Sequence, residues 1–294
     1  MLAVPAPPVR HQQLIVTIYG LYGRSSGDAL PVSVLISMLG DLGYDAPGVR
    51  SSVSRLKAKG VLKSIRRDGV AKYELSETVL DVFREGDQRI FAPERATPLD
   101  AWVLAVFSVP ESMRNRRHQL RSELSGLGFG SVASGVWIAP ARILEQVRER
   151  LTSRGLIQFV DFFQGDYLFD GPMGPKVAAW WDLKAIDEQF AEFLDLYEGA
   201  GEFWAGLVGD DPEAALAEST AELRRDAFRY YIPMLTAWRR FPYRDPNLPL
   251  EYLPEDWKGP AVRKTFQAVH RLAAPLAAAH AQELIHGSVV PVAP

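Results

Sequence analysis

Apolar residues recur at helical spacing over the first 42 positions and predict two helices. Leu14, Ile18 and Leu21 share one face of a helix from Gln12 to Tyr22. A second helix is predicted from Pro31 to Leu42, where apolar residues again align along one side. Each helix has one apolar stripe to bury, so the chain is expected to begin with a packed helical segment.

A third helix is expected after Asp45. Val49, Val53 and Leu56 recur at i, i+4 and i+7, so they form one apolar stripe that faces a core. The Asp45 carboxylate can accept hydrogen bonds from the free N–H groups of the first turn, and Gly60 supplies the left-handed residue that commonly ends a helix.

Two strand-like runs follow this helix, Val61 to Arg66 and Val70 to Leu75, joined through Arg67, Asp68 and Gly69. The Asp-Gly pair favours a tight hairpin, because a type I′ turn needs positive φ angles. A helix followed by a basic two-stranded hairpin is the arrangement of a winged helix-turn-helix.

Strands and helices alternate between positions 99 and 174. The expected elements are a strand from Trp102 to Val109, a helix from Glu111 to Leu127, a strand from Ser131 to Ile138, a helix from Ile143 to Ser153, a strand from Leu156 to Phe163 and a last element near Tyr167 to Phe169. This order predicts a ferredoxin-like α/β sandwich.

The pattern is helical and rich in aromatic residues from position 175 onward. Helices are expected from Lys176 to Tyr197, from Ala214 to Arg240 as one or two elements, and from Ala261 to His286. Two interpretations of the aromatic residues remain open, a plain hydrophobic core and a pocket for a flat ligand.

These patterns predict an α+β protein. The expected division is a disordered tail at 1–10, a winged-helix DNA-binding domain at 11–90, a linker at 91–98, a ferredoxin-like domain at 99–174, an all-helical C-terminal domain at 175–286 and a second disordered tail at 287–294. Two X-Pro steps in FAPERATP favour extended backbone and mark the linker.

Charge changes the picture in one place. The whole chain carries −3, but the stretch from Arg50 to Lys72 has eight Lys and Arg against Asp68 alone, a net +7. A positive field this dense suits a phosphate backbone. Small and basic side chains also lie opposite the apolar stripe of the third helix. The candidate DNA-binding residues are Arg50, Ser51, Ser54, Arg55, Lys57, Lys59, Arg66, Arg67 and Lys72.

The alternatives are a surface helix and hairpin with solvated charges, or a winged helix that binds only proteins. An enzyme acting on nucleic acid or a CoA ester is a third possibility, and an effector-independent DNA-binding protein a fourth.

Catalytic chemistry finds little support in the sequence. The chain has no cysteine, which excludes disulfides and thiolate sites. Gly23 to Gly27 matches G-x-S-x-G but follows a helix rather than the strand that a nucleophile elbow needs. The first central strand ends at Ser108 without a carboxylate for a hard cation. We therefore expect no enzyme activity, no catalytic residue, no metal and no cofactor.

No run approaches the roughly 18 apolar residues of a membrane span. The start of the chain, MLAVPAPPVR, is rich in proline and lacks the pattern of a signal peptide. We therefore expect a cytoplasmic protein that does not contact a membrane.

Three segments resemble the PaaX family of transcriptional repressors of phenylacetic acid degradation operons. They are the first 90 residues, WVLAVFSVPESMRNRRHQLRSELSGLGFGSVASGVWIAP and FPYRDPNLPLEYLPEDWKGPAVRKTF. The resemblance implies a winged-helix domain, a ferredoxin-like domain, a helical C-terminal domain and a homodimer on double-stranded operator DNA. It also implies release from DNA by an aryl-CoA thioester such as phenylacetyl-CoA.

Two arginine clusters are candidates for holding such an effector, because guanidinium groups bind the phosphates of coenzyme A in paired geometry. The candidate effector residues are Arg114, Arg117, Arg121, Trp238, Arg239, Arg240, Tyr243 and Arg244. The alternative for the first cluster is pairing with Glu111 and Glu123 or contact with the DNA backbone.

Overall fold

The computed structural model describes residues 9–24, 29–67, 69–91, 95–168 and 171–287. The chain forms two compact units, each built from separate stretches. Unit 1 comprises 1–87, 193–238 and 261–294, and unit 2 comprises 88–192 and 239–260. Both contain helices and an antiparallel sheet, so the α+β prediction is confirmed at this level. Spatial units do not test domain limits along the chain, so the three-domain division stays a prediction.

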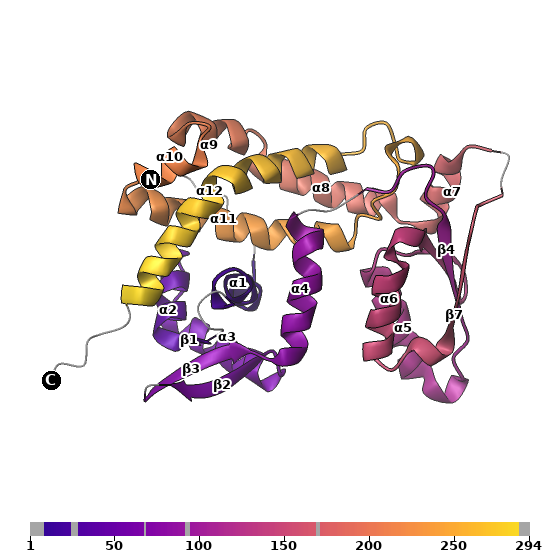
Figure 1. The fold of residues 1–294 in the computed structure, drawn as a ribbon, viewed down its shortest axis with the longest axis horizontal. Coiled ribbons are helices and arrows are strands. Elements are labelled where there is room, and N and C mark those ends of the chain that lie inside the picture. Colours follow the sequence, from indigo (N-terminus) through magenta and orange to yellow (C-terminus); the bar gives the residue numbers. More distant parts are fainter. Residues whose placement is uncertain (1–8, 25–28, 68, 92–94, 169–170, 288–294) are drawn as a thin grey trace. The chain divides into compact units, whose positions relative to one another are not determined.

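The first part of unit 1 is a small sheet with helices packed against it (Figure 1). Its elements are α1 (His11–Ile18), a π-helical turn (Tyr19–Gly23), β1 (Ala29–Pro31), α2 (Val32–Asp41), α3 (Ala46–Ala58), β2 (Leu62–Arg67), β3 (Val70–Leu75) and the beginning of α4 (Glu77–Phe91). The strand order is β1-β3-β2, antiparallel throughout. The positions of the first three predicted helices and of the two hairpin strands are therefore confirmed.

Predicted start and stop signals of α3 are present. The Asp45 side chain accepts a hydrogen bond from the N–H of Gly48 at 3.4 Å, and Gly60 has a φ of 70°. Gly69 has a φ of 76° in the hairpin turn. The neighbouring Asp68 and both predicted tails, apart from residues 9, 10 and 287, lie outside the described residues.

Helices from the C-terminal part of the chain complete unit 1. They are the end of α8 (Leu183–Tyr197), α9 (Ala200–Val208), α10 (Pro212–Ala217), α11 (Ala221–Trp238) and nearly all of α12 (Gly259–Gly287). Helix α1, seen end-on in Figure 1, packs against α11. The Thr236 hydroxyl donates to the Thr17 hydroxyl at 2.8 Å across this buried contact. The first helices are thus packed against helices that lie some 200 positions later in the chain.

An ion cluster joins the end of α2 to the same C-terminal helices, with the Asp41 and His280 side chains largely buried and that of Arg225 exposed. Asp41 Oδ2 lies 2.7 Å from His280 Nε2, and Asp41 Oδ1 lies 2.6 Å from Arg225 Nε. Burial alone raises the pKa of Asp41. The hydrogen bond from His280 and the charge of Arg225 together outweigh burial and hold the pKa below its ordinary 3.8. The carboxylate is therefore ionised, and Nε2–H of His280 donates to it.

We expect Asp41→Asn to destabilise the protein by about 1–3 kcal/mol near neutral pH, because it removes the charge from these hydrogen bonds. A lowered pKa in the folded state contributes stability that is present well above 3.8 and is lost as pH falls through the lowered value. Urea unfolding of both proteins at about pH 7 and about pH 3 measures this. A stability gap that stays constant with pH would contradict the assignment.

Unit 2 contains a four-stranded sheet with two helices on one face (Figure 1). Its elements are β4 (Trp102–Phe107), α5 (Arg114–Gly126), β5 (Gly130–Ala133), β6 (Val136–Pro140), α6 (Leu144–Ser153) and β7 (Val160–Gly165), followed by α7 (Met173–Trp180) and most of α8. The order is β5-β6-β4-β7, and every pair is antiparallel. Leu120, Leu124, Val147 and Leu151 of the helices form the core with Val103 and Ala105 of β4.

Two predicted elements of unit 2 are wrong in detail. The expected strand from Ser131 to Ile138 is a hairpin, β5 and β6, that turns at Gly135. Gly135 has a φ of 80°, and an added Cβ would lie 2.8 Å from the carbonyl oxygen of Phe107. The hairpin contributes two strands where one was predicted. The four-stranded sheet is therefore complete without a strand near Tyr167 to Phe169. Tyr167 and Leu168 are not in a strand, and Phe169 lies outside the described residues.

The expected helix from Lys176 to Tyr197 is also wrong, because it is two helices. Trp181 is extended, with φ −119° and ψ 142°, and its indole N–H donates to the carbonyl of Gly128 at 3.0 Å. The Asp182 carboxylate then accepts from the N–H of Ala185 at 3.1 Å and starts α8. Burying the Trp181 ring against the β5 segment thus outweighs the helical pattern. Helix α9 was not predicted.

Candidate nucleic-acid interface

Helix α3 presents opposite chemistry on its two faces. Val49, Val53 and Leu56 are at most 3% exposed, which confirms the predicted stripe, and Ser52 is buried beside them. The other face is open to solvent. Its exposed residues are Arg50, Ser51, Ser54, Arg55, Lys57, Ala58 and Lys59. The five predicted DNA-binding residues of α3, and Lys59 directly after the helix, therefore all lie on the exposed side.

Hydrogen bonds order part of this face. Arg55 Nη2 donates to the Ser51 hydroxyl at 3.0 Å, one turn earlier on the same face. Lys59 Nζ donates to Gln12 Oε1 of α1 at 3.0 Å. Ser51 thus holds the Arg55 side chain along the helix surface, with other guanidinium donors still available to a ligand.

The hairpin is less basic than its sequence suggests. Glu74 on β3 is opposite Lys63 on β2, and their charged atoms lie 3.1 Å apart. Glu74 also lies 4.0 Å from Arg67. The hydrogen bond that Lys63 donates to the Glu74 carboxylate raises the pKa of Lys63. Glu74 therefore neutralises part of the positive charge of the hairpin. The net charge of +7, counted from Arg50 to Lys72, does not include this acid.

The remaining hairpin residues lie on the same two strands. Arg66 is exposed, and its Nε donates to the carbonyl of Gly69 at 3.3 Å. Lys72 is half-buried and pairs in register with Ile65 and Pro31. The hairpin thus exposes three cations, Lys63, Arg66 and Arg67, but Glu74 pairs with the first and the last of them.

The candidate effector residues fall into separate places. Arg114 and Arg121 are exposed on α5, whereas Arg117 donates to the carbonyl of Val109 at 2.8 Å and pairs with Glu111 at 2.9 Å. In unit 1, the ring of Trp238 stacks on Phe266 with centroids 4.5 Å apart. Trp238 is therefore a core residue.

Four further candidates follow Trp238 in unit 2. Burial lowers the pKa of Arg239 to about 10. Arg240 is exposed, and the ring of Tyr243 lies under the guanidinium of Arg89 at 5.5 Å. Arg244 donates to the side chain of Gln189. Since Arg244 and Tyr243 already have partners within the protein, this cluster has less capacity for phosphate than its sequence suggests.

Most of the aromatic residues form core. In unit 1, the rings of Tyr197 and Trp204 lie 5.9 Å and 5.6 Å from that of Tyr230 in edge-to-face geometry, and all three are at most 6% exposed. Burial raises the pKa of Tyr230 to about 12. This packing favours the core interpretation over a pocket for a flat ligand.

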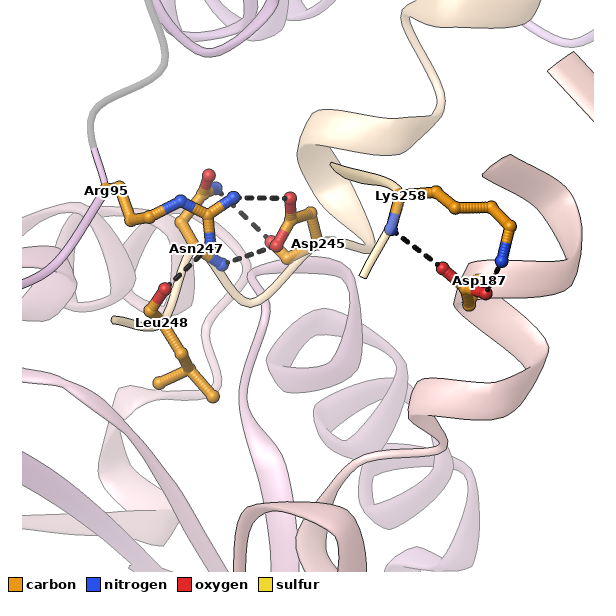
Figure 2. Close-up of polar contacts among 6 residues, drawn as sticks. All are labelled: Arg95, Asp187, Asp245, Asn247, Leu248 and Lys258. Atoms are coloured by element: carbon orange, nitrogen blue, oxygen red, sulfur yellow. Dashed lines mark hydrogen bonds and ion pairs between the residues drawn. The ribbon is translucent and has the colours of Figure 1, made fainter. Parts of the chain in front are cut away.

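A cluster of polar contacts in unit 2 was not predicted as a site (Figure 2). We call these contacts, among Arg95, Asp245, Asn247 and Leu248, the Arg95 clamp. Arg95 Nη2 lies 3.3 Å from Asp245 Oδ2, and Arg95 Nη1 donates to the carbonyl of Leu248 at 2.6 Å. Asp245 Oδ1 accepts from the N–H of Asn247 at 2.9 Å, and Asn247 has a φ of 51°. The Asp-Pro-Asn sequence is a recognisable turn signal, but nothing near it indicates Arg95, which precedes it by 150 positions.

A second ion pair in the same view joins Lys258 to Asp187. Lys258 Nζ lies 2.5 Å from Asp187 Oδ2, and its backbone N–H donates to Oδ1 at 3.0 Å. These contacts tie the segment after Asp245 to α8. Both clusters hold backbone in place, so we assign them a structural role.

Over the ranges that the structure describes, no group of three or more His, Cys, Asp or Glu side chains is arranged to hold a metal. The described helices also include none that is long and apolar enough to cross a membrane.

Three family models match the chain in consecutive order. The model for a PaaX-like protein matches residues 10–79, that for the PaaX protein central Cas2-like domain matches 96–175, and that for the PaaX-like protein C-terminal domain matches 181–283. The chain belongs to the PaaX family, as the resemblance predicted.

A relative of known role is the transcriptional repressor PaaX of Escherichia coli (strain K12). It is 25% identical over 285 residues, which span 96% of this chain and 86% of the relative. A repressor is a regulator rather than an enzyme, in agreement with the prediction that this chain has no enzyme activity. A solved structure of an uncharacterized protein from Mycobacterium tuberculosis aligns with 92% of this chain and 97% of its own, at 22% identity and a TM-score of 0.49.

Proposed function

We propose that this protein is a DNA-binding transcriptional repressor whose α2, α3, β2 and β3 form a winged helix-turn-helix. The observation that carries the proposal is the two-sided character of α3, with a buried apolar stripe on one face and exposed Arg, Lys and Ser on the other. A helix of this kind enters the major groove with its polar face toward the bases. Membership of the PaaX family and the repressor relative support the same reading.

Each candidate residue has a role in this proposal. Ser51, Ser54 and Arg55 meet base edges, because they lie on the outermost part of α3. The remaining cations hold phosphates and place the hairpin beside the groove. They are Arg50, Lys57, Lys59, Arg66, Arg67 and Lys72.

The proposal extends to the central region of unit 2 as a ferredoxin-like domain. The support is its β-α-β-β-α-β order and its antiparallel sheet with both helices on one face. We further propose a cytoplasmic homodimer on a palindromic operator, since two heads related by a two-fold axis read two half-sites.

An aryl-CoA thioester such as phenylacetyl-CoA is the proposed effector. Its binding shifts the protein toward a state with low operator affinity, which requires a coupling free energy of only a few kcal/mol. The family resemblance is the support for this part, and the pathway under control would be phenylacetate or related aromatic acid degradation.

Fluorescence anisotropy of the full chain on its own upstream intergenic DNA tests the proposal. We expect sequence-specific binding that phenylacetyl-CoA reverses and that free phenylacetate and free CoA do not, at one fixed salt concentration. Specific binding that no aryl-CoA thioester reverses would leave an effector-independent DNA-binding protein. If specific binding is absent altogether, the repressor proposal is wrong.

A further inference from the structure

A hollow runs along the outer face of α5 in unit 2. Its lining comes from one helix and consists of polar side chains, all of which except Glu123 carry hydrogen-bond donors. The lining residues are Arg114, Asn115, His118, Gln119, Ser122 and Glu123. Arg121 does not line the hollow, but it lies on the same stripe of α5 as Arg114 and His118, because the three residues are spaced i, i+4 and i+7. We call Arg114, His118 and Arg121 the α5 stripe.

The acid beside the α5 stripe is already neutralised. Glu123 Oε2 lies 3.7 Å from Arg150 Nη1, and Glu123 Oε1 lies 3.5 Å from Arg154 Nε. Both partners come from α6 or the turn that follows it. The carboxylate therefore offsets little of the positive charge that Arg114 brings to the hollow.

The two arginines of the α5 stripe differ from the neighbouring arginines of α5 in their side-chain partners. Arg117 pairs with Glu111, and Arg116 donates to Gln119 and to the carbonyl of Arg154. Arg114 and Arg121 have no hydrogen-bond or ion-pair partner within the described ranges, and both are exposed. The helix thus leaves unpaired the two guanidinium groups that face the same side.

Their spacing suits a ligand with more than one phosphate. Seven positions at 1.5 Å per residue separate Arg114 and Arg121 by about 10 Å along the helix axis, with His118 between them. Each guanidinium offers parallel donors that match two phosphate oxygens, and Asn115 and Ser122 add neutral donors at the edge. A single carboxylate ligand would occupy only one end of this row.

We propose that the α5 stripe is a phosphate-binding surface, separate from α3. Two sources of phosphate fit the proposed function, the coenzyme A part of the effector and the backbone of DNA outside the recognised bases. The existence of the surface does not depend on the repressor assignment, and only the choice between these sources rests on it.

The test compares Arg114→Gln/Arg121→Gln with Arg142→Gln/Arg148→Gln in the full chain. Both double variants remove two exposed charges from unit 2, but the second pair lies off the α5 stripe: Arg142 is in the 3-10 turn before α6, and Arg148 is on α6. Binding of free coenzyme A is measured by calorimetry. Operator affinity is measured by anisotropy over a range of salt concentrations.

If the effector supplies the phosphates, the α5 stripe variant binds coenzyme A at least about tenfold more weakly and keeps its operator affinity. If DNA supplies them, the salt slope of operator binding falls by about two units and coenzyme A binding is unchanged. Both changes together would assign both ligands to the surface.

The proposal is overturned if the α5 stripe variant matches the wild type in both measurements, or if the control variant changes them equally. Failure of the wild type to bind operator DNA would refute the repressor proposal while leaving the coenzyme A arm as a test of the α5 stripe. Thermal melting of both variants confirms that the exposed substitutions leave the fold intact.

Discussion

Arg55→Ala is expected to lower affinity for the cognate operator about tenfold or more and to flatten the preference between operator and altered sequences. The Arg55 guanidinium lies on the exposed face of α3, and one base-specific pair of this kind is worth about 1–3 kcal/mol of discrimination. Nonspecific affinity should fall much less, because it depends on phosphate contacts made by other cations.

The structure favours Arg55 over the other cations for this role. Arg55 is held by Ser51 at 3.0 Å on the outer face of α3, opposite the buried stripe. A side chain already held in one direction loses less conformational freedom when it binds. Lys59, in contrast, reaches back to Gln12 of α1.

Anisotropy with the operator and with operators altered at one base pair measures the effect at fixed salt. Two lysines serve as matched controls. Lys57→Ala should weaken all sequences evenly and lower the salt slope by about one unit. Lys63→Ala should change the slope little, because Glu74 and Glu77 lie 3.1 Å and 3.7 Å from its Nζ. Uniform weakening by Arg55→Ala would place that residue among the phosphate contacts.

Local patterns were sufficient to predict α3 and the hairpin of β2 and β3. The buried stripe of α3 follows from a 3.6-residue period, and its ends follow from Asp45 and Gly60. The prediction failed where tertiary packing decides. Trp181 interrupts a helical pattern because its ring packs on Gly130, where an added Cβ would lie 2.6 Å from the indole.

Local patterns were also sufficient to predict which α3 residues of the candidate interface are exposed. Exposure of the basic face of α3 follows from its amphipathic pattern, but its use for DNA stays a prediction. The pairing of Lys63 with Glu74 follows from the hairpin register, which places the two residues opposite each other. The count of charges from Arg50 to Lys72 missed this pairing because it ended before Glu74. The Arg95 clamp had no such signal, because its partners are brought together only by the fold.

The second large effect is a loss of stability, expected when the Arg95 clamp is broken. Asp245→Ala should destabilise the protein by about 3–5 kcal/mol, the usual cost of removing one partner of a buried ion pair. Asp245 is 7% exposed and the Arg95 side chain 18%, so the guanidinium would lose its carboxylate without gaining full access to water. The N–H of Asn247 would also lose its acceptor, in a turn where Asn247 has a φ of 51°.

A double-mutant cycle with Arg95→Ala measures the pair itself. We expect the double variant to be more stable than the sum of the single losses predicts, by about 0.5–3 kcal/mol, because the second substitution removes the charge that the first left unpaired. Urea unfolding, followed by the fluorescence of the tryptophans and by circular dichroism, supplies the free energies. Coincident transitions with the two probes would license a two-state treatment. Additive losses would mean that Asp245 acts through the turn at Asn247 alone and that Arg95 is held by the carbonyl of Leu248, a bond that Asp245→Ala does not remove.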